Sequence, residues 1–363
     1  MSRIYFADAR LKKLSPDYSL PAKFIRMLDK MDLKERFEGK RVAVKVHLGG
    51  HLGYTTIPVL FMGILVKKIK EAGGRPFVCD GGSAVPTAKD RGYTEETLGC
   101  PVISAQGATE SYYKSVPIGY GCLDTAELCG EIVNADAMVV FSHGKGHGMC
   151  GFGGAIKNIG MGNVSYQTRG KIHRLQEAEV TWDADKCSHC RFCQTNCPAG
   201  AISFDDKDVL HLDLHSCRYC MHCTLSCPTK AIRVGEESMR AFQSGMARVT
   251  KACLDEFEPG RVLFINFMRD ITPFCDCWGF SSPSLVPDIG IFAGEDIVSV
   301  ETASIDSIKN ENFIPSSLPE QLTLQDKDCH LMERIHGKNP YLQCEEAQAL
   351  GLGEMAYDIE RVE

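Results

Sequence analysis

Eight cysteines in the middle of the chain follow one spacing twice. The first copy reads Cys187-x-x-Cys190-x-x-Cys193-x-x-x-Cys197-Pro198, and the second reads Cys217-x-x-Cys220-x-x-Cys223-x-x-x-Cys227-Pro228. In this spacing three thiolates of a tight loop hold one iron–sulfur cubane, and the fourth cysteine holds the other cluster. The spacing therefore predicts two [4Fe–4S] clusters. One is assigned to Cys187, Cys190, Cys193 and Cys227, and the other to Cys217, Cys220, Cys223 and Cys197.

A pair of zinc knuckles is the alternative for these cysteines. Zinc sites typically use two CxxC pairs, whereas each half here has three cysteines in CxxCxxC followed by CP. The segment resembles the two-cluster ferredoxins of bacteria. This resemblance implies an α+β module that carries out one-electron chemistry.

A glycine-rich segment, 142–162, follows a predicted strand, where α/β folds bind ligands. Its glycines allow a ligand to approach the backbone closely. We assign catalytic roles to His143, His147 and Lys157, because they supply two titratable groups and a cation. We expect the cofactor to be bound by Gly151, Gly153, Gly154 and Asn158. A tight structural turn is the alternative for this segment, which has neither the Walker nor the dinucleotide-binding spacing.

Cys275 and Cys277 form a Cys-x-Cys pair just past another predicted strand. The pair could supply thiolates to a metal, form a redox disulfide, or consist of two buried thiols. We include both cysteines among the predicted metal ligands. Asp80, Asp288 and Asp296 follow or flank apolar runs, and we expect them to be solvated loop carboxylates.

The elements that must position these groups alternate between strands and helices. Valine-rich or apolar strands are predicted at 41–48, 75–79, 135–141 and 261–267, and a helix at 58–69 begins at Pro58 and ends before a Gly-Gly pair. This alternation predicts an α/β fold with a parallel sheet. Because the pattern stops at the cysteines and resumes after them, the ferredoxin-type module is predicted to be an insertion. The expected divisions are 1–180 and 237–363 for the two parts of the host domain and 181–236 for the inserted module.

Composition limits the function classes. The chain has 363 residues, 18 cysteines and a net charge of −7. An acidic chain of this kind is a poor partner for nucleic acid or an anionic membrane. The first residues have no signal-peptide pattern, and the longest apolar run is too short to span a bilayer. We therefore expect a cytoplasmic protein whose cysteines are thiols or metal ligands.

Four segments together resemble the DUF362 family of iron–sulfur proteins: the Lys45-Val46 strand, the loop 151–158, the CDCWG sequence at 275–279 and the segment 286–291. The resemblance covers the chain from about Ile4 to Leu352 and implies an architecture, while the cellular role of that family is largely undefined. Two stretches depart from the family pattern, at 56–58, which lacks an arginine, and at 296–301. In addition, His147 and Lys157 with Gly-Phe-Gly-Gly between them are similar to a stretch of the nickel-pincer lactate racemases. In that family the lysine tethers the cofactor and the histidine takes part in proton or hydride chemistry.

Three functions compete. The first is a redox enzyme in which two [4Fe–4S] clusters supply electrons to a small-molecule or metal site in the host domain. The second is an electron carrier without catalysis of its own, and the third delivers a metal or cluster through Cys275 and Cys277. We expect a redox partner protein, and the first function also implies a small-molecule substrate. The additional metal or small cofactor is not identified by the sequence.

Overall fold

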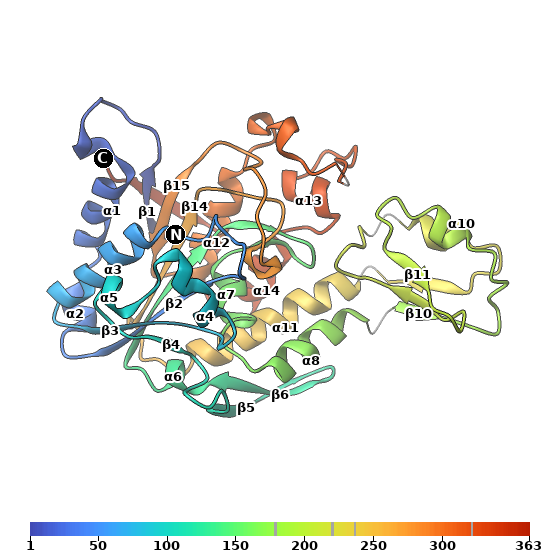
Figure 1. Cartoon of the computed structure of the whole chain (residues 1–363), viewed down its shortest axis with the longest axis horizontal. Coiled ribbons are helices and arrows are strands. Elements are labelled where there is room, and N and C mark those ends of the chain that lie inside the picture. The colour runs from blue at the N-terminus through green and yellow to red at the C-terminus, as the bar shows by residue number, and fades with distance from the viewer. Residues whose placement is uncertain (178–179, 219–220, 236, 321) are drawn as a thin grey trace.

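An eight-stranded sheet forms the centre of the molecule (Figure 1). The computed structural model describes all residues except 178–179, 219–220, 236 and 321. In spatial order the strands are β16 (Tyr357–Arg361), β1 (Ser2–Asp8), β15 (Gly290–Gly294), β14 (Val262–Met268), β7 (Ala137–His143), β2 (Arg41–Val46), β3 (Arg75–Asp80) and β4 (Val102–Ser104).

The predicted parallel sheet requires a correction at β15. This strand pairs antiparallel with both β1 and β14, whereas the other neighbours in the sheet pair in parallel. The reason is the connection 269–289, whose only regular element is a short 3-10 helix, Asp276–Trp278. A strand parallel to β14 would have to start at the end of the sheet where β14 begins, so it would need a long crossover connection, usually a helix. The chain instead stays at the edge where β14 ends, so Gly290 pairs with Met268.

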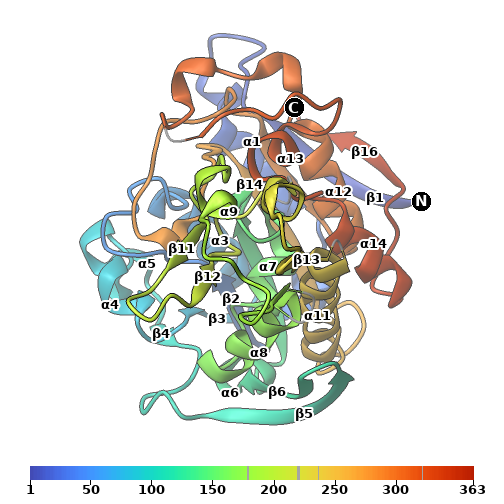
Figure 2. The same cartoon turned by 90° about the vertical axis from the view of Figure 1, so that its right-hand side faces the viewer.

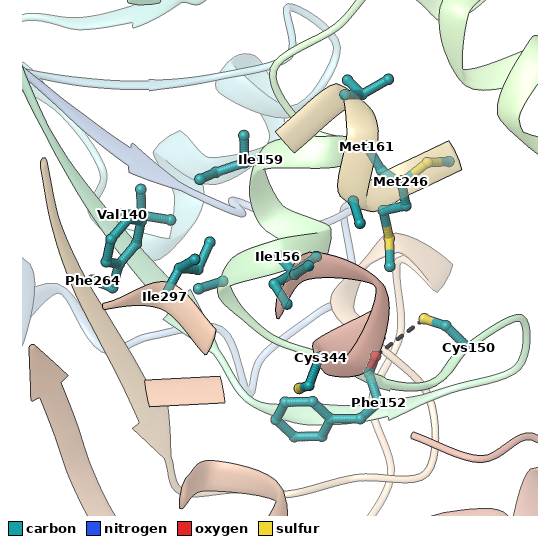
Figure 3. Close-up of a cluster of buried hydrophobic side chains, with 14 of the residues drawn as sticks. Val140, Cys150, Phe152, Ile156, Ile159, Met161, Met246, Phe264, Ile297 and Cys344 are labelled. Carbon is teal, nitrogen blue, oxygen red and sulfur yellow. Dashed lines mark hydrogen bonds between the residues drawn. The ribbon is translucent and has the colours of Figure 1, made fainter. Parts of the chain in front are cut away.

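Helices cover both faces of the sheet, and the alternation of side chains along each strand separates two cores. Val139 and Phe141 of β7 pack with the first core, and Met138 and Val140 pack with the second. The first core is covered by α1 (Leu20–Asp29), α2 (Leu33–Phe37) and α3 (Val59–Glu71). The second is covered by α7 (Ala155–Gly160), α8 (Tyr166–Glu177), α11 (Glu237–Leu254), α12 (Ile297–Ser307) and α14 (Leu342–Ala349). Figure 3 shows Phe152 and Ile156 of the glycine-rich segment within the second core.

Shorter elements complete the body. They are α4 (Ala84–Ala88), α5 (Glu95–Leu98), the hairpin of β5 (Tyr113–Tyr120) and β6 (Leu123–Cys129), α6 (Gly130–Val133), the hairpin of β8 (Lys145–His147) and β9 (Gly151–Gly153), and α13 (Leu331–His336). The apolar helix predicted at 58–69 corresponds to α3. None of the helices in the described part of the chain is long and apolar enough to cross a membrane.

The cysteine-rich segment lies to one side of the sheet body (Figures 1 and 2). It contains β10 (Val180–Trp182), α9 (Phe192–Thr195), β11 (Ile202–Phe204), β12 (Leu210–Leu212), α10 (His222–Ser226) and β13 (Ile232–Val234). β10 pairs antiparallel with β13, and β11 pairs with β12. Because Val180 lies opposite Val234, the chain enters and leaves this segment at neighbouring positions.

Candidate functional site

A cavity of about 490 Å³ lies where β2, β3 and β7 end. Its wall comes from six parts of the chain: 47–50, 80–84, 142–162, 166–173, His215 and 275–277. The carboxyl ends of parallel strands lie at one edge of a sheet, which brings these loops together. The predicted residues His143, His147, Gly153, Gly154, Lys157, Asn158, Cys275 and Cys277 all line this cavity.

Cys275 and Cys277 are joined by a disulfide at the cavity wall. Lys157 Nζ lies 3.6 Å from Cys275 Sγ. One ring nitrogen of His147 and the two cysteine sulfurs lie within 4.8 Å of one another. The glycine-rich segment and the Cys-x-Cys segment therefore meet, although more than a hundred residues separate them in sequence.

His147 has a defined tautomer. Its Nδ1 accepts a hydrogen bond from the backbone N–H of Met149 at 3.2 Å, so Nε2 is the nitrogen left to carry a proton or a metal. Burial lowers the pKa of His147 well below its ordinary value, and the neighbouring Lys157 lowers it further. The imidazole is therefore neutral, which is the form that binds metals.

Asp276, between the two cysteines, anchors their segment in a buried polar network. Its carboxylate accepts from Lys145 Nζ at 2.6 Å and lies 3.1 Å from His143 Nδ1. Burial alone would raise the pKa of Asp276, but His143 and Lys145 outweigh it and lower that pKa. His143 Nε2 also contacts the carbonyl of Arg269 at 2.6 Å. Because both ring nitrogens of His143 have protein partners, this residue positions Asp276.

A second buried network involves Asp80, which the sequence placed in solvent. Asp80 accepts from Lys45 Nζ at 3.0 Å and from the backbone N–H of Leu48 at 2.8 Å, and it lies 3.1 Å from His47 Nδ1. Burial favours the neutral acid, but Lys45, His47 and the hydrogen bonds from His47 and Leu48 together outweigh it and lower the pKa of Asp80. The signal in the sequence was Lys45, a cation inside a valine-rich strand rather than at its end. Of the other two carboxylates, Asp288 pairs with Arg269, and Asp296 caps α12.

Asn158 and the predicted glycines have different roles. Asn158 Oδ1 accepts from Lys45 Nζ at 2.7 Å, and its amide donates to Ser142 Oγ at 2.9 Å. Gly153 and Gly154 line the cavity. Gly151 is not among the residues that line the cavity, and a Cβ at this position would lie 2.4 Å from the carbonyl oxygen of Lys338. Its φ of +75° also favours glycine there.

One face of α8 lines the cavity and was not predicted. Tyr166, Arg169, Gly170 and His173 have the spacing i, i+3, i+4 and i+7, which places them on one side of a helix. This face combines polar and aromatic residues with few apolar ones, so a search for an apolar stripe does not detect it. The sequence did offer one signal for this face, namely a stripe of polar residues on a helix that directly follows the glycine-rich segment.

The cysteine loops repeat one local geometry. A first small cavity is lined by Cys187, Cys190, Cys193 and Cys227, and a second by Cys197, Cys217 and Cys223. Cys220 lies outside the described residues. In both copies the backbone N–H four residues beyond the last cysteine donates to its sulfur at 3.2 Å, from Ala201 to Cys197 and from Ala231 to Cys227. Arg191 and Met221 take the same left-handed conformation at matching positions.

The second cysteine loop touches the large cavity. The ring of His215, two residues before Cys217, lies 5.3 Å from the ring of His147 and 5.0 Å from that of Trp278, between centroids. Lys338 is buried beside the same loop and donates to the carbonyl oxygens of Leu214 and Cys217. Burial lowers the pKa of Lys338 to about 8. The loop is therefore held between the cavity and the C-terminal part of the chain.

Comparison with solved structures gives distant matches. The apoprotein of lactate racemase from Thermoanaerobacterium thermosaccharolyticum is 14% identical with a TM-score of 0.37, and the match covers 81% of this chain and 54% of that one. A Thermotoga maritima protein solved by a structural genomics consortium is 14% identical with a TM-score of 0.36, and the match covers 70% of this chain and 52% of that one. This chain spans about half the length of each.

No curated protein matches the chain. A family model does match: it is described as a domain of unknown function, DUF362, and it aligns with residues 42–306. The match spans the strands that end at the large cavity, the glycine-rich segment, both cysteine loops and Cys275–Cys277. Because it covers well over half of the 363 residues, this chain belongs to the DUF362 family.

Proposed function

We propose that this chain is an iron–sulfur redox protein that delivers electrons, through two [4Fe–4S] clusters, to the large cavity of its α/β body. Residues 181–236 are the module that holds the clusters, inserted between the host segments 1–180 and 237–363. A redox partner protein supplies the electrons, and a small molecule or a metal in the cavity receives them. When bound, the clusters contribute one-electron transfer.

The donor sets support this assignment. Thiolate sulfurs are the ligands of such clusters, and the first group, Cys187, Cys190, Cys193 and Cys227, has the three-plus-one composition that the motif predicts. The described members of the second group are Cys197, Cys217 and Cys223. The backbone N–H groups of Ala201 and Ala231 point at ligand sulfurs, and such hydrogen bonds tune cluster potentials. Zinc sites typically use two CxxC pairs, whereas the first group combines a CxxCxxC loop with the distant Cys227.

The observation that carries the proposal is the contact between His215 and His147. His215 belongs to the loop of the second cysteine group, and His147 belongs to the cavity that contains Cys275 and Cys277. An electron carrier without catalysis has no need of such a contact with an interior cavity. The contact therefore favours delivery of electrons into the α/β body.

The group through which electrons enter the cavity, on their way to that small molecule or as part of that metal site, is assigned to the Cys275–Cys277 segment. As a disulfide it accepts two electrons and two protons, which breaks the S–S bond and leaves two thiols. In the reduced state His147, Cys275 and Cys277 offer one nitrogen and two sulfurs to a borderline or soft metal, and the cavity leaves further positions open. Metal analysis after reduction distinguishes a redox disulfide, which binds no metal when reduced, from a metal site, which does. The same measurement tests the metal-delivery alternative, which requires a metal that leaves readily.

The test begins with anaerobically purified full-length protein. We expect about eight irons per chain and a broad absorption band that dithionite bleaches. Cys187→Ser and Cys217→Ser should each reduce the iron content and lose the electron paramagnetic resonance signal of one cluster. Cys122→Ser is the matched control, because Cys122 is an exposed thiol outside both cysteine groups. Stoichiometric zinc without iron after anaerobic reconstitution would contradict the proposal.

A further inference from the structure

The charges of the large cavity do not balance. Its two carboxylates, Asp80 and Asp276, are already paired with buried Lys45 and Lys145. Two further cations, Lys157 and Arg169, line the cavity, and neither forms an ion pair with any carboxylate of the described residues. The one hydrogen bond of the Lys157 ammonium within the described structure is to Cys275 Sγ.

Arg169 is the clearest unmatched group. Its Nε is buried and has no hydrogen-bond partner within the described structure. Arginine is always charged and can only donate, so an unsatisfied buried guanidinium nitrogen carries a desolvation cost that a bound acceptor removes. Two other buried nitrogens of the cavity wall, Nε2 of His47 and Nε2 of His215, also have no partner among the described residues.

The position of Arg169 fixes where an acceptor would lie. The guanidinium Nη2 is 3.7 Å from the point that a Cβ on Gly81 would occupy, directly after β3. Arg169 thus reaches from α8 to the end of the sheet, and glycine at position 81 leaves the space next to its guanidinium open. His173 lies one turn further along α8, and after burial the charges of Lys157 and Arg169 are what lowers the pKa of His173. Both cations therefore act on the same part of the cavity.

We propose that the cavity binds a small organic anion, with its carboxylate or phosphate group held by the Arg169 guanidinium and Lys157. This deepens the proposed function by naming the class of its substrate, and it rests on that function only for the electron transfer. Bidentate pairing with arginine is the common way in which proteins hold such planar or tetrahedral anions. A volume of about 490 Å³ suits a small molecule. Since Lys157 also contacts Cys275, the anionic group would place the rest of the ligand beside the Cys275–Cys277 pair.

Isothermal titration of the anaerobic full-length protein tests the inference with malonate and inorganic phosphate as probes. Neutral malonamide is the matched control for malonate, and sodium chloride keeps the ionic strength constant. We expect at least one of the two anions to bind, and malonamide to bind at least tenfold more weakly than malonate if malonate is that anion. The anion that binds identifies the recognised group as carboxylate or phosphate.

Variants on α8 locate the binding. Arg169→Gln should weaken binding of the recognised anion at least tenfold, and Arg169→Lys should weaken it less, because it keeps the charge but not the fork of donors. Arg174→Gln makes the same charge change on an exposed position of the same helix and should leave affinity unchanged. The inference is overturned if neither anion binds, or if Arg169→Gln and Arg174→Gln have equal effects.

Iron content measured on the same samples separates this inference from the proposed function. Iron-loaded protein that binds neither anion overturns the anion site alone. Protein that binds an anion through Arg169 but holds zinc in place of iron overturns the redox function alone.

Discussion

Glu301 makes the stability of the cavity wall depend on pH. This carboxyl group is fully buried on α12 and accepts from the backbone N–H of Ala155 at 2.7 Å and from Asn266 Nδ2 at 2.9 Å. It thereby supports the first turn of α7, the helix that carries Lys157. Burial raises the pKa of Glu301 from 4.5 to about 7, and the hydrogen bonds from Asn266 and Ala155 offset only part of that rise.

The direction of the effect follows from proton linkage. Between pH 4.5 and about 7 the folded protein holds a proton on Glu301 that the unfolded chain has lost. The stabilisation is thus complete below pH 4.5 and is lost as the pH rises through 7. A shift of this size corresponds to about 3 kcal/mol at most, because one pKa unit is worth about 1.4 kcal/mol. For a chain of 363 residues that is a change in melting temperature of about 4 °C.

The assay compares wild type with Glu301→Gln by anaerobic thermal unfolding from pH 5 to pH 8. Glutamine cannot ionise, so the difference in melting temperature between the two proteins isolates this group. We expect wild type to lose about 3 °C relative to Glu301→Gln across that range, because at pH 5 the unfolded carboxyl group has already lost most of its protons. Glu311→Gln, at an exposed glutamate, should track wild type. A constant difference between wild type and Glu301→Gln would refute the reasoning, because it would mean that Glu301 does not titrate in this range.

Two further predictions concern the body of the protein. Lys45→Met should destabilise the fold by about 3–5 kcal/mol in urea unfolding, because it leaves the buried Asp80 carboxylate without its cation. The double variant Lys45→Met/Asp80→Asn should recover part of that loss. A Lys45→Met protein as stable as wild type would argue that Asp80 is neutral. Replacing residues 185–234 with a short flexible linker should leave a soluble body with a cooperative thermal transition, since β10 and β13 lie side by side at the ends of the segment. Its melting temperature should be lower because the deletion removes Leu214 and Val234 from the second core, and an insoluble product would show that the segment is part of the host core.

The sequence predicted the elements whose pattern is local and strong. The strands at β2, β3, β7 and β14 are apolar runs bounded by turn residues, and α3 lies between Pro58 and the Gly73-Gly74 pair. The pattern did not predict β16, a half-exposed edge strand with the polar sequence YDIER. Nor did it predict the antiparallel direction of β15, which depends on where the connection from β14 ends.

For the candidate site too, some features could be predicted from the sequence and others depend on the tertiary structure. Spacing alone predicted how the cysteines group, because each loop is short and local; the N–H···S bonds of Cys197 and Cys227, for example, join residues four apart. Spacing also selected His147, Lys157 and the Cys275–Cys277 pair as separate signals. It could not show that Lys157 contacts Cys275, that Asp80 and Asp276 are already neutralised, or that Arg169 is left unmatched. Those relations join residues separated by up to 131 positions, such as Lys145 and Asp276. Only the packing of parallel strands brings their loops to one edge, and only the complete set of neighbours decides which buried charges have partners.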